Sequence, residues 1–131
     1  LDPSRWVPAP AQGALAVEAR EDRDDLVALF EALGDRRSAA AVTCERAFAA
    51  RLEGGCSVPL GCLAASQDDR LIVTGFLGLA DGSEIVRDRV SGPLDEAAQL
   101  GAELAEAMLA AGGEDILAEL RSTDASMPSP P

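Results

Sequence analysis

The sequence predicts an α+β fold: a three-stranded antiparallel sheet with helices on one face, preceded by a strand–helix remnant of another domain. Three short runs between residues 60 and 90 are rich in apolar residues and separated by turn signals, which predicts a meander of hairpins. Stretches with helical periodicity flank these runs on both sides. The 131 residues, of which 47% are hydrophobic, suffice for one domain with a modest core.

The first 34 residues are expected to form a connector followed by a strand and a helix. Residues 1–10 contain three prolines and predict an extended connector, and residues 11–13 are typical of a turn. Residues 14–19 alternate like a short buried strand. Apolar residues then recur at helical spacing up to Gly34, which supplies a stop signal. One strand and one helix are too little to form a domain alone.

Residues 35–121 are predicted to form the main domain, in the order α-β-β-β-α-α. The polar residues Asp35–Ser38 mark its start, and Ser38 can cap a helix that runs toward Leu52. Asp81-Gly82 is a strong hairpin signal. The expected strands are residues 60–66, 71–78 and 84–90.

Two further helices are expected after the sheet. Gly92-Pro93 opens a long helix and Gly112-Gly113 ends it. A short helix over residues 114–120 follows, and residues 122–131, with three prolines, are expected to be a flexible tail. The apolar stripes of the two long helices of this domain are Ala41, Cys44, Phe48 and Leu52, and Leu94, Ala97, Gly101, Leu104 and Met108.

The composition excludes several classes of function. The net charge of −12 and the absence of any Lys/Arg-rich run argue against a nucleic-acid partner. No apolar run approaches the roughly 20 residues of a membrane span. Three cysteines without CxxC spacing, and no histidine, argue against a metal site or a disulfide framework and favour the cytoplasm. The start without methionine or a signal peptide suggests a fragment of a longer protein.

One loop concentrates the chemical interest of the chain. Gly54 and Gly55 end a helical pattern, Cys56 and Ser57 follow, and Pro59 stiffens the exit. A thiol at such a junction has the partial exposure that reactive cysteines need. A free cysteine is more often a small buried hydrophobe, so these residues alone leave both interpretations open.

Two long motifs resemble one family. Residues 45–48 with 52–61, and residues 8–20 upstream, are similar to the C-terminal part of porphobilinogen deaminase, also called hydroxymethylbilane synthase. The resemblance extends from about Leu1 to Leu120. It implies an origin in a transferase of tetrapyrrole biosynthesis, which joins four porphobilinogen molecules into hydroxymethylbilane with loss of ammonia.

The resemblance also implies the roles of particular residues. Cys56 matches the cysteine that anchors a dipyrromethane cofactor as a thioether, with Gly55 and Ser57 beside it. Gln12 and Gly13 match a motif that lines the cofactor and substrate cleft. Residues 1–34 then belong to the first domain of the parent enzyme, and residues 35–121 form its cofactor-anchoring domain. The expected partners are porphobilinogen, the growing polypyrrole chain and the missing N-terminal domains.

Departures from the family pattern limit these expectations. The family's acid/base aspartate and carboxylate-binding arginines come from the missing domains, so the fragment is expected to be inactive, with no catalytic residue of its own. Ala11 stands where the family usually has glycine, and Cys62 where a small residue is common.

Several alternatives remain open at this point. The chain could be a non-catalytic acidic α+β interaction module, or a thiol redox or metal protein. Gln12 could simply close a turn, and Glu45, Arg46 and Arg20 are interpreted first as structural ion pairs or hydrogen bonds to loops.

Overall fold

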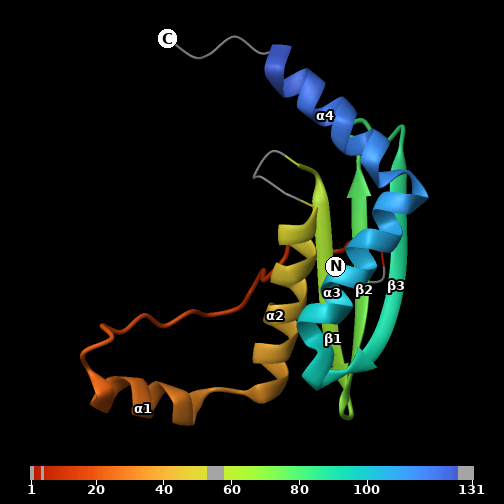
Figure 1. Cartoon of the computed structure of the whole chain (residues 1–131). Helices are drawn as coiled ribbons and strands as arrows, with labels where there is room; N and C mark the ends of the chain where they lie inside the picture. Colours follow the sequence, from red (N-terminus) through yellow and green to blue (C-terminus); the bar gives the residue numbers. More distant parts are fainter. Residues whose placement is uncertain (1, 4, 53–57, 127–131) are drawn as a thin grey trace.

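The computed structural model describes residues 2–3, 5–52 and 58–126, and it has the predicted α+β architecture. Three antiparallel strands form an open sheet in the order β1-β2-β3 (Figure 1). The two hairpins are in register, with Leu60 opposite Leu77 and Gly78 opposite Ile85. The strands are β1 (Leu60–Gln67), β2 (Arg70–Gly78) and β3 (Ile85–Pro93), which confirms the three expected runs.

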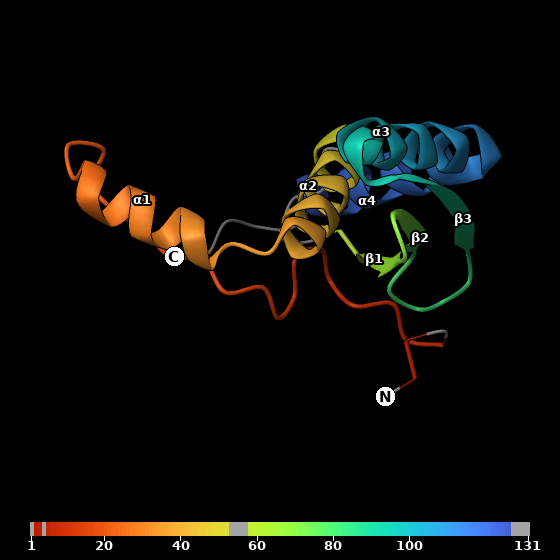
Figure 2. The same cartoon turned by 90° about the horizontal axis from the view of Figure 1, so that it is seen from below.

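Helices cover one face of this sheet, while the N-terminal connector lies on the other side (Figure 2). Helix α2 precedes β1, and α3 follows β3 after one 3₁₀ turn, η1. A kinked turn, η2, in which Gly112 has a φ of 111°, then leads into α4. The helical elements are α1 (Asp24–Leu33), α2 (Arg36–Arg51), η1 (Leu94–Glu96), α3 (Ala97–Met108), η2 (Leu109–Gly113) and α4 (Glu114–Ser126).

The N-terminus of α2 is capped by a residue other than the predicted one. The carboxylate of Asp35 accepts hydrogen bonds from the backbone N–H and the hydroxyl of Ser38, both at 2.7 Å. These two bonds hold the pKa of Asp35 below its usual value. Ser38 is therefore the donor to the cap, and Asp35 is the capping residue.

The core lies between the helices and the sheet. The predicted stripes of α2 and α3 point into it, and Phe48 and Met108 are fully buried in the same core cluster as Leu71 and Val73 of β2. Helices α2 and α3 approach closely at Gly101, where an added Cβ would lie 2.1 Å from the carbonyl oxygen of Cys44. Of the predicted stripe residues only Ala41 is partly buried, and the others are buried.

Two expectations differ from the structure. Residues 14–19 form no strand, because no strand in the described part of the chain lies beside them to supply ladder hydrogen bonds. Helix α1 forms as predicted, but none of its residues is buried, and it stands apart from the sheet (Figure 1). Helix α4 continues to Ser126, so residues 122–126 are helical instead of part of a tail; residues 127–131 are not described.

Candidate functional site

The predicted anchor loop falls between two fixed ends. Cys56, with Gly55 and Ser57, lies outside the described residues. On the helix side, Leu52 caps α2 and is only 1% exposed. On the strand side, the carbonyl oxygen of Pro59 accepts a 3.1 Å hydrogen bond from Gly78, at the end of β2. The described residues on either side of Cys56 are therefore both attached to the packed body.

The other two cysteines are sealed in the core. Cys44 on α2 and Cys62 on β1 are both 0% exposed and unpaired. Burial raises the pKa of the Cys44 thiol to about 11 and raises that of Cys62 further, because the interior penalises a thiolate. The thiolate is the nucleophilic form, so neither residue is suited to covalent chemistry. The placement of Cys44 on the buried stripe of α2 is confirmed, and Cys62 lies in the interior of β1, the first expected strand.

The turn that carries Gln12 and Gly13 is closed by its own hydrogen bonds. The side-chain oxygen of Gln12 accepts from the backbone N–H of Ala9 at 3.1 Å, and the Gln12 N–H donates to the Ala9 carbonyl at 3.0 Å. Ala11 and Gly13 both have positive φ, 60° and 87°. Gln12 is exposed, and it closes the turn as the structural alternative predicts.

This turn is attached to the body through Glu45. Glu45 lies on α2, is 6% exposed, and accepts hydrogen bonds from the backbone N–H groups of Ala11 and Ala64. The interpretation of Glu45 as a hydrogen-bonding partner of loops is therefore confirmed. Sequence reasoning missed that it joins the connector to β1; the available signal was a carboxylate on the apolar stripe of α2, between Ala41 and Phe48. Arg20, in contrast, pairs with Asp22 at 2.6 Å on the surface.

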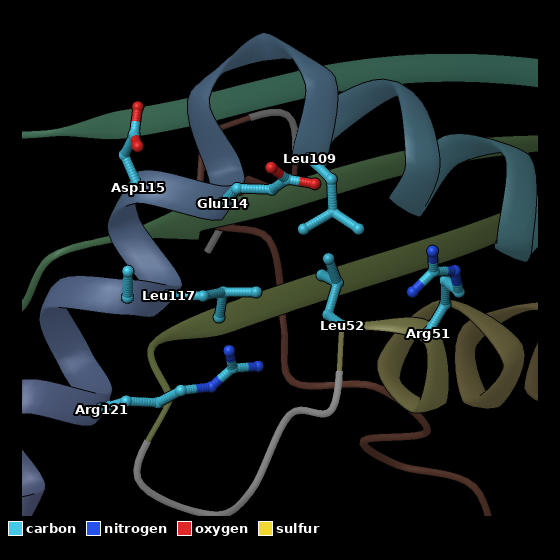
Figure 3. Close-up of a pocket in the computed structure, with 8 residues that line it drawn as sticks. Arg51, Leu52, Leu109, Glu114, Asp115, Leu117 and Arg121 are labelled. Carbon is cyan, nitrogen blue, oxygen red and sulfur yellow. The ribbon is translucent and has the colours of Figure 1, made fainter.

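A recess of about 410 Å³ lies beside Leu52, the last described residue before the anchor loop (Figure 3). Arg51 and Arg121 contribute guanidinium groups to its lining, and Glu114 and Asp115 contribute carboxylates. Arg51 also donates to Glu106 of α3 at 2.5 Å. Because the lining carries two positive and two negative side chains, the recess gives no net attraction to a polyanion. No local sequence pattern predicts this recess, because its lining residues come from α2, η2 and α4, which are far apart in the chain.

The described residues lack the features of two other classes of site, membrane spans and metal centres. No helix among them combines the length and the apolar character that crossing a membrane requires. No group of three or more His, Cys, Asp or Glu side chains in residues 2–3, 5–52 and 58–126 is arranged to hold a metal ion.

Comparisons with known proteins agree with one another. Residues 39–110, more than half of the chain, match the family described as "Porphobilinogen deaminase, C-terminal domain". The chain is 45% identical over 118 residues to porphobilinogen deaminase of Roseiflexus castenholzii, covering 90% of this chain and 39% of that protein. It is 42% identical over 120 residues to the enzyme of Trichlorobacter lovleyi, covering 92% and 38%. The chain thus spans less than two fifths of the length of these relatives.

Proposed function

Because the chain belongs to the porphobilinogen deaminase family, we propose that it is the cofactor-anchoring part of a hydroxymethylbilane synthase. The parent enzyme would act in tetrapyrrole biosynthesis, as a transferase that joins four porphobilinogen molecules with loss of ammonia. In this proposal residues 35–121 are the anchoring domain, and residues 1–34 belong with the first domain. The unpaired thiols of Cys44 and Cys62 favour a reducing compartment, the cytoplasm.

The observation that supports the proposal is the burial of two of the three thiols, those of Cys44 and Cys62. Cys44 and Cys62 are sealed and protonated, so a thioether in this chain has to form at Cys56. Porphobilinogen that loses ammonia leaves an electrophilic methylene carbon. The Cys56 thiolate would form a C–S bond to that carbon and then act as a tether. When bound, dipyrromethane supplies the free pyrrole end to which further units are added.

The Gln12 turn suggests how a neighbouring residue would contribute. The oxygen of the Gln12 amide already accepts from Ala9, so its NH₂ group is the part suited to a ligand. An NH₂ group donates, which favours contact with a carboxylate of the cofactor or substrate over contact with a pyrrole N–H. Gly13 would let the backbone approach closely beside it. The arginines that neutralise the polycarboxylate chain are expected from the missing domains.

The competing idea of a self-contained interaction module made a different prediction. A closed core completed by residues 14–34 would have favoured it. Instead Leu15 and Leu33 are 98% and 75% exposed, as expected for a segment whose packing partner lies elsewhere in a longer protein.

The test is a mass measurement on the full-length protein that contains this chain. We expect added mass on a peptide containing Cys56, and we expect Cys56→Ser to lose both this mass and the release of ammonia. Cys62→Ala, at a sealed position, is the matched control and should keep the mass. Modification mapped to Cys44 or Cys62, or an intact mass increment in Cys56→Ser, would overturn the proposal.

The reactivities of the same three thiols can also be compared in the chain alone. At pH 8 an alkylating reagent should modify Cys56, while Cys44 stays protonated far below its pKa of about 11. Only after unfolding should all three cysteines react. The isolated chain should release no ammonia from porphobilinogen.

A further inference from the structure

Glu45 is a buried carboxylate that the proposed chemistry does not use. It lies on the face of α2 that carries Phe48 and Leu52 into the core, and only 6% of its surface is exposed. Burying a carboxylate is unfavourable unless hydrogen bonds replace its water. Its presence on this face therefore requires specific partners.

The two oxygens of Glu45 hold two different segments of backbone. Oε1 accepts from the N–H of Ala64 on β1 at 2.8 Å, and Oε2 accepts from the N–H of Ala11 in the connector at 2.6 Å. A carboxylate has an acceptor at both positions. A glutamine has one acceptor oxygen and would place its NH₂ group against the second N–H. Only a carboxylate of this length meets both donors.

The neighbouring contacts place the connector along the open edge of β1. The N–H of Cys62 donates to the carbonyl oxygen of Pro8 at 2.9 Å. At Gly61 an added Cβ would lie 2.8 Å from the carbonyl oxygen of Val7, so the connector backbone passes very close to the strand. After Ala11, residues 12–25 are all exposed. The bond from Ala11 to Glu45 thus holds the chain immediately before this exposed stretch.

We propose that Glu45 is a positioning residue, whose carboxylate clamps the Ala9–Gly13 turn to the edge of β1 so that Gln12 keeps a fixed place relative to α2. This inference rests on the proposed function, since it assigns the turn to the cofactor cleft. Glu45 lies on α2, and Leu52, the C-cap of this helix, follows seven positions later. At 1.5 Å per residue this separation is about 10 Å along the helix.

A positioning role fits the choice of side chain at residue 45. An apolar group there would leave the N–H groups of Ala11 and Ala64 without an acceptor, and a neutral amide could accept from only one of them. A carboxylate shared between two backbone donors instead fixes the turn in one register. The turn needs such a constraint, because Ala11 adopts a left-handed φ of 60°, which is unfavourable for alanine.

The experiment compares Glu45→Gln and Glu45→Asp with wild type in the full-length protein. Glu103→Gln is the matched control, because it removes one carboxylate charge from an exposed position on α3. Three quantities are measured: hydrogen exchange of peptides covering residues 7–13 and 60–66, the cofactor mass on Cys56, and kcat and KM for porphobilinogen well below the melting temperature.

We expect Glu45→Gln to keep its cofactor mass, to exchange at least tenfold faster over residues 7–13, and to lose kcat by about 10- to 100-fold. Glu45→Asp should fall between Glu45→Gln and wild type, and Glu103→Gln should match wild type. Unchanged exchange over residues 7–13, or faster exchange with wild-type kcat, would overturn the inference.

A wild-type measurement covers the case in which both variants fail to fold. The Ala11 amide should then be protected in the unmodified protein although its turn is exposed, and rapid exchange there would refute the clamp. Failure of the proposed function is separate, because it would appear as a wild-type protein without mass on Cys56.

Discussion

The packed body and the N-terminal arm of this chain differ in how deeply they bury apolar side chains, although both have such side chains at regular spacing. The body comprises residues 36–52 and 58–123, and the arm comprises residues 12–34. Both contain apolar residues at regular spacing. In the body these residues are buried, as at Phe48 and Leu104, whereas in the arm Leu33 remains 75% exposed. A periodic pattern therefore predicts which side chains of an element are suited to burial. Whether they are buried depends on a second element that packs against them.

The arm shows how much the burial of a helix depends on the elements around it. Helix α1 has ten residues, a length at which isolated helices are marginal in water. Its first turn has Asp24 and Asp25, which suit the positive end of the helix dipole. Local signals thus favour the helix, although none of its side chains is fully buried among the described residues.

The largest expected effect is in the body, at the contact between α2 and α3. Gly101→Ala would place a Cβ 2.1 Å from the Cys44 carbonyl oxygen, so the two helices would have to separate. We expect the free energy of unfolding to fall by about 2–3 kcal/mol, measured by urea denaturation of this chain. Helix propensity alone predicts the opposite sign, a gain of about 1 kcal/mol.

The control for this substitution is Gln99→Ala, at an exposed position on the same helix. It should change the free energy of unfolding by no more than about 0.5 kcal/mol. A stabilised Gly101→Ala variant would mean that α2 and α3 are less tightly packed than the 2.1 Å approach at Gly101 implies. The contrast between body and arm would then weaken.

The body is also the region that the sequence predicts best. The alternation between residues 60 and 90 placed all three strands, and the stripe from Leu94 to Met108 correctly identified the buried face of α3. These elements are specified by short-range patterns whose partners are neighbours in the chain. The strand expected at residues 14–19 was wrong in this structure, because a strand exists only with a partner.

The candidate site was predictable only in part. The loop and the turn could be singled out, since glycine and proline mark them. The bridge from Glu45 to Ala11 spans 34 positions in the sequence, and no local rule connects two residues so far apart. The capping of α2 by Asp35 was missed for a simpler reason, because Asp35 and Ser38 are both good capping residues and only the structure shows which one accepts.

A smaller effect is expected where arm and body meet. Ala11→Gly should raise the free energy of unfolding by about 0.5–1 kcal/mol, because glycine relieves the cost of φ = 60° at a residue that Glu45 holds in place. Ala11→Val should have the opposite sign, since a β-branched residue resists this conformation. Urea midpoints of both variants, with exposed Ala14→Gly as control, measure the effect. If neither substitution shifts the midpoint, the turn is not part of the cooperative body.

The smallest effect in this chain is expected in the arm, and its size should depend on what surrounds the arm. Leu33→Ser should change the unfolding of the chain alone by no more than about 0.5 kcal/mol, because the side chain is already 75% exposed. In the full-length protein we expect a loss of about 2 kcal/mol, since burying a leucine contributes that much when a partner covers it. Leu104→Ser, in the core, should destabilise both forms and serves as the control. Equally small effects of Leu33→Ser in both proteins would show that the arm stays uncovered in the parent, and the difference between the two regions would then reflect the sequence of the arm instead of a missing partner.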